Sequence, residues 1–133
     1  MQVNDYLYKN FEMMFPYIAE QVVDIRKGMA LELVMTLKDG TRMSYYDPEQ
    51  TIRKLPGDGS DMTYEEFAME FGIRLARMMK IKCVSQLELS NATWVTQSSI
   101  SNYINGKKLP ELYTIYKIAK YLDCEVDDFI YRY

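Results

Sequence analysis

Apolar side chains recur every three or four residues near the start of the chain, which is the spacing of one face of an α-helix. The pattern predicts a helix that Asn4 caps and Gly28 ends. Pro16 falls inside this segment and predicts either a kink or two abutting helices. The apolar face consists of Leu7, Phe11, Met14, Ile18, Val22 and Ile25.

Alternating apolar residues on both sides of Asp39-Gly40 predict a β-hairpin. A three-residue loop with Gly40 left-handed pairs Met35 with Met43 and keeps apolar side chains on one face, whereas a two-residue turn mixes the faces. We therefore expect the longer loop, with the apolar face packed on the preceding helix. Because a helix and two strands make a small core, this unit should need a partner, either the second domain or another copy. The expected face is Leu31, Leu33, Met35, Leu37, Met43 and Tyr45.

A short run rich in Pro, Gly and Asp separates the hairpin from the rest of the chain. Such a composition is typical of a linker. We predict an α+β protein with a helix and β-hairpin domain at 1–55, a linker at 56–62 and an all-α domain of five helices at 63–133.

The C-terminal domain begins with the form of a capping box, Thr63 to Glu66, on a helix that should run to about Lys82. Ser85 and Thr96 are expected to cap two short helices, 86–93 and 97–105, with a tight turn between them. This is the helix-turn-helix arrangement. A fourth helix opens at Pro110 and a short fifth one covers 125–133. The inward side chains of the second, third and fourth helices should be Leu89, Ala92, Ile100, Ile104, Leu112, Ile115, Ile118, Ala119 and Leu122.

The outward face of the third helix is unusual, because it carries Ser, Asn and Gln where a solvated helix usually carries Lys and Glu. These side chains both donate and accept hydrogen bonds, fit close to the floor of a DNA groove and avoid repulsion by phosphates. The face consists of Gln97, Ser98, Ser101, Asn102 and Asn105.

The net charge of −3 is unevenly distributed along the chain. It divides into −6 over 1–71, +5 over 72–110 and −2 over 111–133. The segment that holds the two short helices is therefore basic within an acidic protein, which suits a nucleic-acid partner.

The chain contains no histidine, so it lacks the commonest general base and the commonest transition-metal ligand. We expect no enzymatic activity, no metal and no cofactor. Cys83 and Cys124 lack a CxxC spacing and are expected to be buried, reduced thiols. The absence of an apolar membrane span or secretory signal predicts a cytoplasmic location and no membrane partner.

Residues from about 71 to 130 resemble the Cro and lambda-repressor type of helix-turn-helix DNA-binding domain, often called Xre-like. The resemblance rests on "SQLELS", "VTQSSISNYINGKKLP" and "IYKIAKYLDCEVDDFI". It implies that the third helix reads double-stranded DNA. Bases would be contacted by Gln97, Ser98, Ser101 and Asn102, and phosphates by Gln86, Thr96, Asn105, Lys107 and Lys108.

The resemblance implies a sequence-specific transcriptional regulator, a repressor that binds a two-fold-related operator as a homodimer. The N-terminal domain is the first candidate for dimerisation and residues 121–133 are the second. The alternative is an antitoxin-like protein whose residues 1–55 bind a partner protein while the helix-turn-helix autoregulates.

Trp94 departs from the family pattern, which commonly has Gly in the turn between the second and third helices. A left-handed backbone at this position would be strained for Trp. Either the turn has a different shape, or packing of Trp94 offsets the strain.

Overall fold

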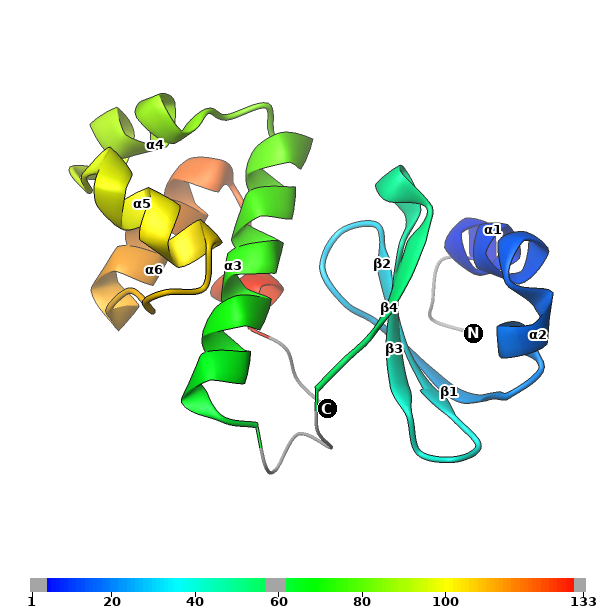
Figure 1. Ribbon diagram of the computed structural model, residues 1–133. Coiled ribbons are helices and arrows are strands. Elements are labelled where there is room, and N and C mark those ends of the chain that lie inside the picture. The colour runs from blue at the N-terminus through cyan, green and yellow to red at the C-terminus, as the bar shows by residue number, and fades with distance from the viewer. Residues whose placement is uncertain (1–4, 57–61, 131–133) are drawn as a thin grey trace. The chain divides into compact units, whose positions relative to one another are not determined.

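The computed structural model describes residues 5–56 and 62–130, and the chain divides into two compact units, Met1–Asp61 and Met62–Tyr133. Most of the predicted linker, 57–61, lies outside the described residues. The N-terminal unit contains helices and a sheet and the C-terminal unit is helical, so the predicted α+β class is correct (Figure 1). Within the described residues, no helix is both long and apolar enough to cross a bilayer.

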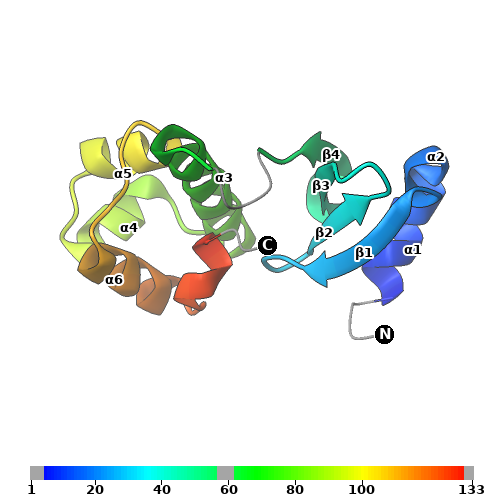
Figure 2. The ribbon, with the colours of Figure 1, turned by 90° about the horizontal axis from the view of Figure 1, so that it is seen from below.

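The N-terminal unit consists of two short helices followed by an antiparallel sheet of four strands in chain order. Both helices lie beside one face of the sheet (Figure 2). The elements are α1 (Asp5–Met14), α2 (Pro16–Ala19), β1 (Val22–Lys27), β2 (Glu32–Leu37), β3 (Arg42–Tyr46), the 3-10 turn η1 (Asp47–Glu49) and β4 (Thr51–Lys54).

The prediction of helix up to Gly28 is wrong, because helix ends at Ala19 and Val22 and Ile25 lie in β1. Of the two expectations for Pro16, the pair of abutting helices is correct, since Pro16 begins α2. Val22, Val23 and Ile25 are β-branched and fit a pleated surface, although their spacing also matched a helical stripe. The sheet therefore has four strands where the sequence predicted two.

The predicted hairpin register is confirmed. Met35 pairs with Met43 and Leu33 with Tyr45, and Gly40 has a φ of 88°. The apolar face of the hairpin packs against α1 around Phe11, whose ring centroid lies 5.5 Å from that of Tyr45. The buried cluster consists of Leu7, Phe11, Leu33, Met35 and Tyr45.

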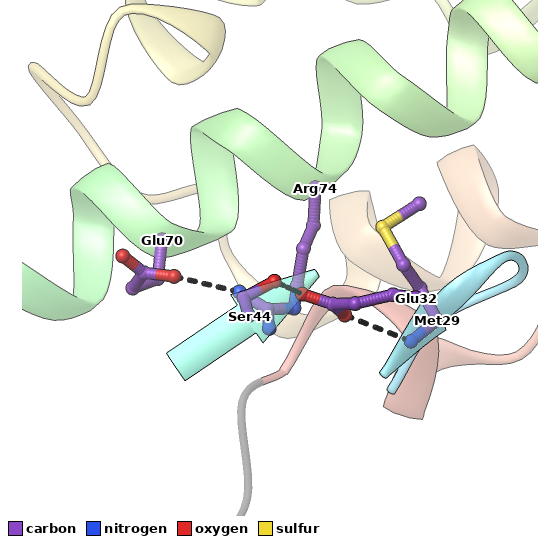
Figure 3. A network of polar contacts seen from close by, with 5 residues as sticks. All are labelled: Met29, Glu32, Ser44, Glu70 and Arg74. Carbon is purple, nitrogen blue, oxygen red and sulfur yellow. Dashed lines mark hydrogen bonds and ion pairs between the residues drawn. The ribbon is translucent and has the colours of Figure 1, made fainter. Parts of the chain in front are cut away.

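On the other face of the sheet, the Glu32 carboxylate of β2 joins the turn before β2 to strand β3 (Figure 3). It accepts a hydrogen bond from the backbone N–H of Met29 at 3.0 Å and another from the Ser44 hydroxyl at 2.5 Å. A Cβ on Gly28 would lie 2.1 Å from the same carboxylate. A side chain at Gly28 would therefore have to displace the Glu32 carboxylate.

The C-terminal unit contains α3 (Tyr64–Ile81), α4 (Gln86–Thr93), α5 (Gln97–Ile104), α6 (Leu112–Leu122) and the 3-10 turn η2 (Val126–Phe129). The capping box at Thr63 is confirmed. The fifth helix is wrong as an α-helix, because its described residues form only the 3-10 turn and 131–133 lie outside the described residues.

The core of the C-terminal unit is built from α3, α4, α5 and α6, with Phe129 of η2 5.7 Å from Phe71 between ring centroids. Two expected inward residues are wrong: Leu112 is 74% exposed and Ala92 is exposed. In α5 the second buried residue is Tyr103, while Ile104 is half-buried. The buried apolar residues are Ala68, Phe71, Leu75, Met78, Met79, Leu89, Ile100, Tyr103, Ile118, Ala119, Leu122 and Phe129.

Candidate nucleic-acid interface

The helix-turn-helix is formed by α4 and α5, which contact each other, while α3 packs on α5 and α6 packs on α4 (Figure 1). Each short helix begins at a side-chain cap. The Ser85 hydroxyl accepts from the N–H of Glu88 at 3.0 Å, and the Thr96 hydroxyl accepts from the N–H of Ser99 at 3.1 Å. The two predicted caps are confirmed, and they fix where α4 and α5 start.

Gly72 sets the distance between α3 and α5. A Cβ at this position would lie 2.5 Å from the carbonyl oxygens of Tyr103 and Ile104. Because both opposing atoms belong to the backbone, a side chain could be admitted only by moving a helix. Sequence reasoning missed this contact, although a glycine inside an apolar helical stripe is a signal of close packing.

The end of α5 is fixed by a Schellman motif. The N–H of Gly106 donates to the carbonyl of Tyr103 at 3.1 Å, and the N–H of Lys107 donates to that of Asn102 at 2.9 Å. Gly106 has a φ of 72°. Lys107 and Lys108, both exposed, therefore leave the helix end in a defined direction.

Two side-chain contacts from α6 hold α4 in place. Lys117 Nζ donates to the carbonyl oxygen of Thr93 at 2.9 Å, where a cation also complements the C-terminal end of α4. The Tyr121 hydroxyl donates to the Glu88 carboxylate at 2.5 Å, and this bond raises the pKa of Tyr121. Neither contact was predicted, because residues 24 and 33 positions apart carry no local signal of pairing.

The predicted base-contact residues all lie on α5, and the structure brings them together on its outward side. Gln97 and Ser98 are exposed, whereas Ser101 and Asn102 are half-buried. Their contacts with DNA remain a prediction.

The predicted phosphate-contact residues lie at the ends of the two helices and are exposed. Gln86 is the first residue of α4, and Lys107 and Lys108 follow α5. Asn105 Nδ2 donates to Ser101 Oγ at 3.3 Å, and the Thr96 hydroxyl donates to Ser99 Oγ at 3.0 Å. These contacts with phosphate also remain a prediction.

The positive charge available to a polyanion is smaller than the net charge of +5 over residues 72–110 indicates. Arg74 is 2% exposed and forms an ion pair with Glu70 at 2.8 Å (Figure 3). The positive character of the interface therefore comes from exposed lysines such as Lys107 and Lys108. No acidic side chain occurs from 89 to 110.

The prediction of two buried thiols is wrong for Cys83, which is exposed in the turn after α3. Cys124 is half-buried, and burial raises its pKa to about 11. At neutral pH the Cys124 thiol is therefore protonated and weakly nucleophilic.

Trp94 satisfies neither of the two alternatives considered for it. Its φ of 61° and ψ of 27° are left-handed, so the turn keeps the conformation that favours glycine. The residue is 93% exposed, so intramolecular packing does not offset the strain.

A comparison with protein families agrees with this geometry. Residues 73–129 match the family model described as helix-turn-helix, of the Xre and lambda-repressor type. The chain is similar to the crystal structure of the restriction-modification controller protein C.AhdI from Aeromonas hydrophila, at 27% identity and a TM-score of 0.46. That similarity covers 47% of this chain and 96% of the other. No curated protein matches the chain significantly.

Proposed function

The C-terminal half of this chain is a helix-turn-helix DNA-binding domain of the Cro and lambda-repressor type, and from this premise we propose that the protein is a transcriptional repressor that binds a two-fold-related operator as a homodimer. The observation that carries the proposal is the outward side of α5. It is uncharged and rich in hydrogen-bonding groups, and both ends of the helix are fixed. Such a surface can enter a major groove without repulsion by the phosphates.

In this proposal the two sets of contacts have different roles. Gln97 and Asn102 have amides that can pair with an adenine edge, and Ser98 and Ser101 can donate or accept. Lys107 and Lys108 neutralise phosphates and supply affinity that does not depend on sequence. Together with these two lysines, the other predicted phosphate contacts position the domain on the duplex. They are Gln86, Thr96 and Asn105.

We assign residues 63–133 to DNA binding and 1–55 to dimerisation, joined by a linker at 56–62. The support for the second role is the outer surface of the two N-terminal helices. Tyr6 is 63% exposed, Met13 81% and Tyr17 82%. Tyr6 and Met13 are seven residues apart and so lie on one side of α1. Exposed apolar side chains of this size are typical of protein interfaces.

The experiment is selection of bound duplexes from a random pool by the full-length protein, with sedimentation of the protein alone. We expect an enriched site with two-fold symmetry and half-sites about 10 base pairs apart. We also expect the protein without DNA to sediment as a dimer. The substitutions Met13→Asp and Tyr17→Asp should each convert it to a monomer. A monomer at micromolar concentration together with an unenriched pool would contradict the proposal.

The same exposed surface supports a second candidate, an antitoxin-like protein in which residues 1–55 bind a different protein. The net charge of −6 over 1–71 would suit a basic partner. Co-purification from the native cell distinguishes the candidates. A stoichiometric second protein lost in the Met13→Asp variant favours the antitoxin-like role, and recovery of the chain alone favours the homodimer.

A further inference from the structure

The indole of Trp94 is a side chain for which the fold of its own domain provides no role. It is 93% exposed, on a backbone with a φ of 61°. Glycine adopts this conformation without steric cost, whereas a bulky residue is strained. Trp also has a large apolar surface that stabilises a fold only when it is buried. The isolated domain therefore bears a cost for this residue and gains no burial from it.

The backbone that carries the indole is held on both sides. The N–H of Trp94 donates to the carbonyl of Ser90 at 3.0 Å. Lys117 Nζ donates to the carbonyl of Thr93, the preceding residue, at 2.9 Å. Thr96, two residues later, caps α5. The Cα–Cβ bond of a residue on such a support has a defined direction, which favours contact with a ligand.

The surroundings of Trp94 favour an anionic ligand. The ammonium of Lys117 lies beside the preceding carbonyl, and the sequence from 89 to 110 is free of acidic residues. The Glu88 carboxylate of α4 accepts the Tyr121 hydroxyl of α6. The indole itself has an N–H donor and no acceptor, together with an apolar face. These groups match a phosphate oxygen and the deoxyribose next to it.

We propose that Trp94 is a DNA contact, in which the indole lies against the sugar-phosphate backbone and its Nε1–H donates to a phosphate oxygen. This inference rests on the proposed function. The N-terminal end of a recognition helix is the part that approaches the bases, and Trp94 stands three residues before Gln97, the first residue of α5. Because the contact is with the backbone, it raises affinity for every sequence and leaves the sequence preference unchanged.

The test uses the full-length protein and two fluorescein-labelled duplexes of about 20 base pairs, one of random sequence at low salt and one from the selection. Trp94 is the chain's single tryptophan, so its fluorescence reports this site alone. We expect either duplex to protect the indole from acrylamide, a neutral quencher that DNA does not repel. Trp94→Ala and Trp94→Gly should each lower the affinity for both duplexes about ten-fold.

The two substitutions separate the ligand contact from the backbone strain. Trp94→Gly relieves the left-handed strain and should raise the Tm relative to Trp94→Ala by about 4 °C, although both lose DNA affinity. Leu112→Ala removes another exposed apolar side chain of the same unit, 74% exposed, and should leave the affinity unchanged.

A wild-type protein that binds neither duplex would overturn the proposed function and this inference together. A wild-type protein that binds DNA while acrylamide still quenches the indole fully, with an affinity equal to that of Trp94→Ala, would overturn the Trp94 contact but not the proposed function. Dissociation of a DNA-free oligomer by Trp94→Ala, with no loss of affinity per domain, would place the indole in a protein interface and would also overturn it.

Discussion

The two units of the protein are stabilised by different kinds of contact. In the N-terminal unit, antiparallel strand pairs such as Met35 with Met43 build the sheet, and the aromatic contact of Phe11 with Tyr45 holds α1 against it. In the C-terminal unit, the position of α5 depends on its caps and on the close approach of Gly72. Because backbone contacts and caps determine the position of α5, its outward side chains contribute little to the fold and are available to a ligand.

This comparison predicts that the largest effect comes from removing the aromatic centre of the N-terminal unit. Phe11→Ala should destabilise that unit by about 3–5 kcal/mol, because it removes the fully buried ring by which α1 contacts Tyr45 of the sheet. Amide exchange measured by NMR should show loss of protection in β2 and β3, with protection retained in α4 and α5. Equal loss in both units would contradict the separation of the two cores.

Gly72→Ala should have the next largest effect and act on the other unit. The added methyl meets the carbonyl oxygens of Tyr103 and Ile104, and overpacking against backbone should cost about 2 kcal/mol. Chemical denaturation of the variant provides the measurement. Gly40→Ala is the matched control, because its added Cβ meets no atom within 4 Å and only its φ of 88° opposes it, at about 1 kcal/mol. A Gly72→Ala protein as stable as the wild type would show that α3 and α5 can separate freely.

The paired substitution of Lys107→Gln and Lys108→Gln should leave the fold unchanged and alter DNA binding. Both side chains are exposed, so the Tm should stay constant. The slope of log affinity against log salt should decrease by about 2, one for each lost phosphate contact. Lys38→Gln, an exposed lysine of the N-terminal unit, should leave the slope unaltered, and an equal decrease in that control would contradict a local contact.

Tyr121→Phe should have the smallest effect, a slight fall in Tm, because it deletes the bond that joins α6 to Glu88 of α4. This bond raises the pKa of Tyr121, so its stabilisation is fully present below the ordinary pKa of tyrosine, near 10. It is lost as the pH rises through the higher pKa of the folded state. Melting of both proteins from pH 8 to pH 12 should therefore show a difference that disappears at the alkaline end, and a constant difference would exclude this bond as its source.

The helix-turn-helix could be predicted because its signals are local. Ser85 and Thr96 cap the helices, and Gly106 ends α5, within a few residues of the apolar positions they define. Strand β1 could not be predicted in this way, since Ile25 becomes part of a sheet only by pairing with Met35. Its spacing fits a helix equally well when that partner is unknown.

The candidate site divides in the same way. The sequence supplied the polar face of α5 and the two lysines, but not the bracing of α4 by Lys117 and Tyr121. The residue type predicted strain at Trp94 only for a left-handed turn, and the sequence left the shape of that turn open. The exposure of the indole depends on how α4 and α6 pack and was not predicted. The missed features are those that only tertiary contacts determine.

The most direct measurement is a map of amide chemical shifts in the full-length protein as a selected duplex is added. We expect the largest changes on α5, at Gln97, Ser98 and Asn102, with further changes at Lys107 and Lys108. A duplex that binds while these amides stay in place, with the shifts confined to other surfaces, would contradict the claim that α5 reads DNA.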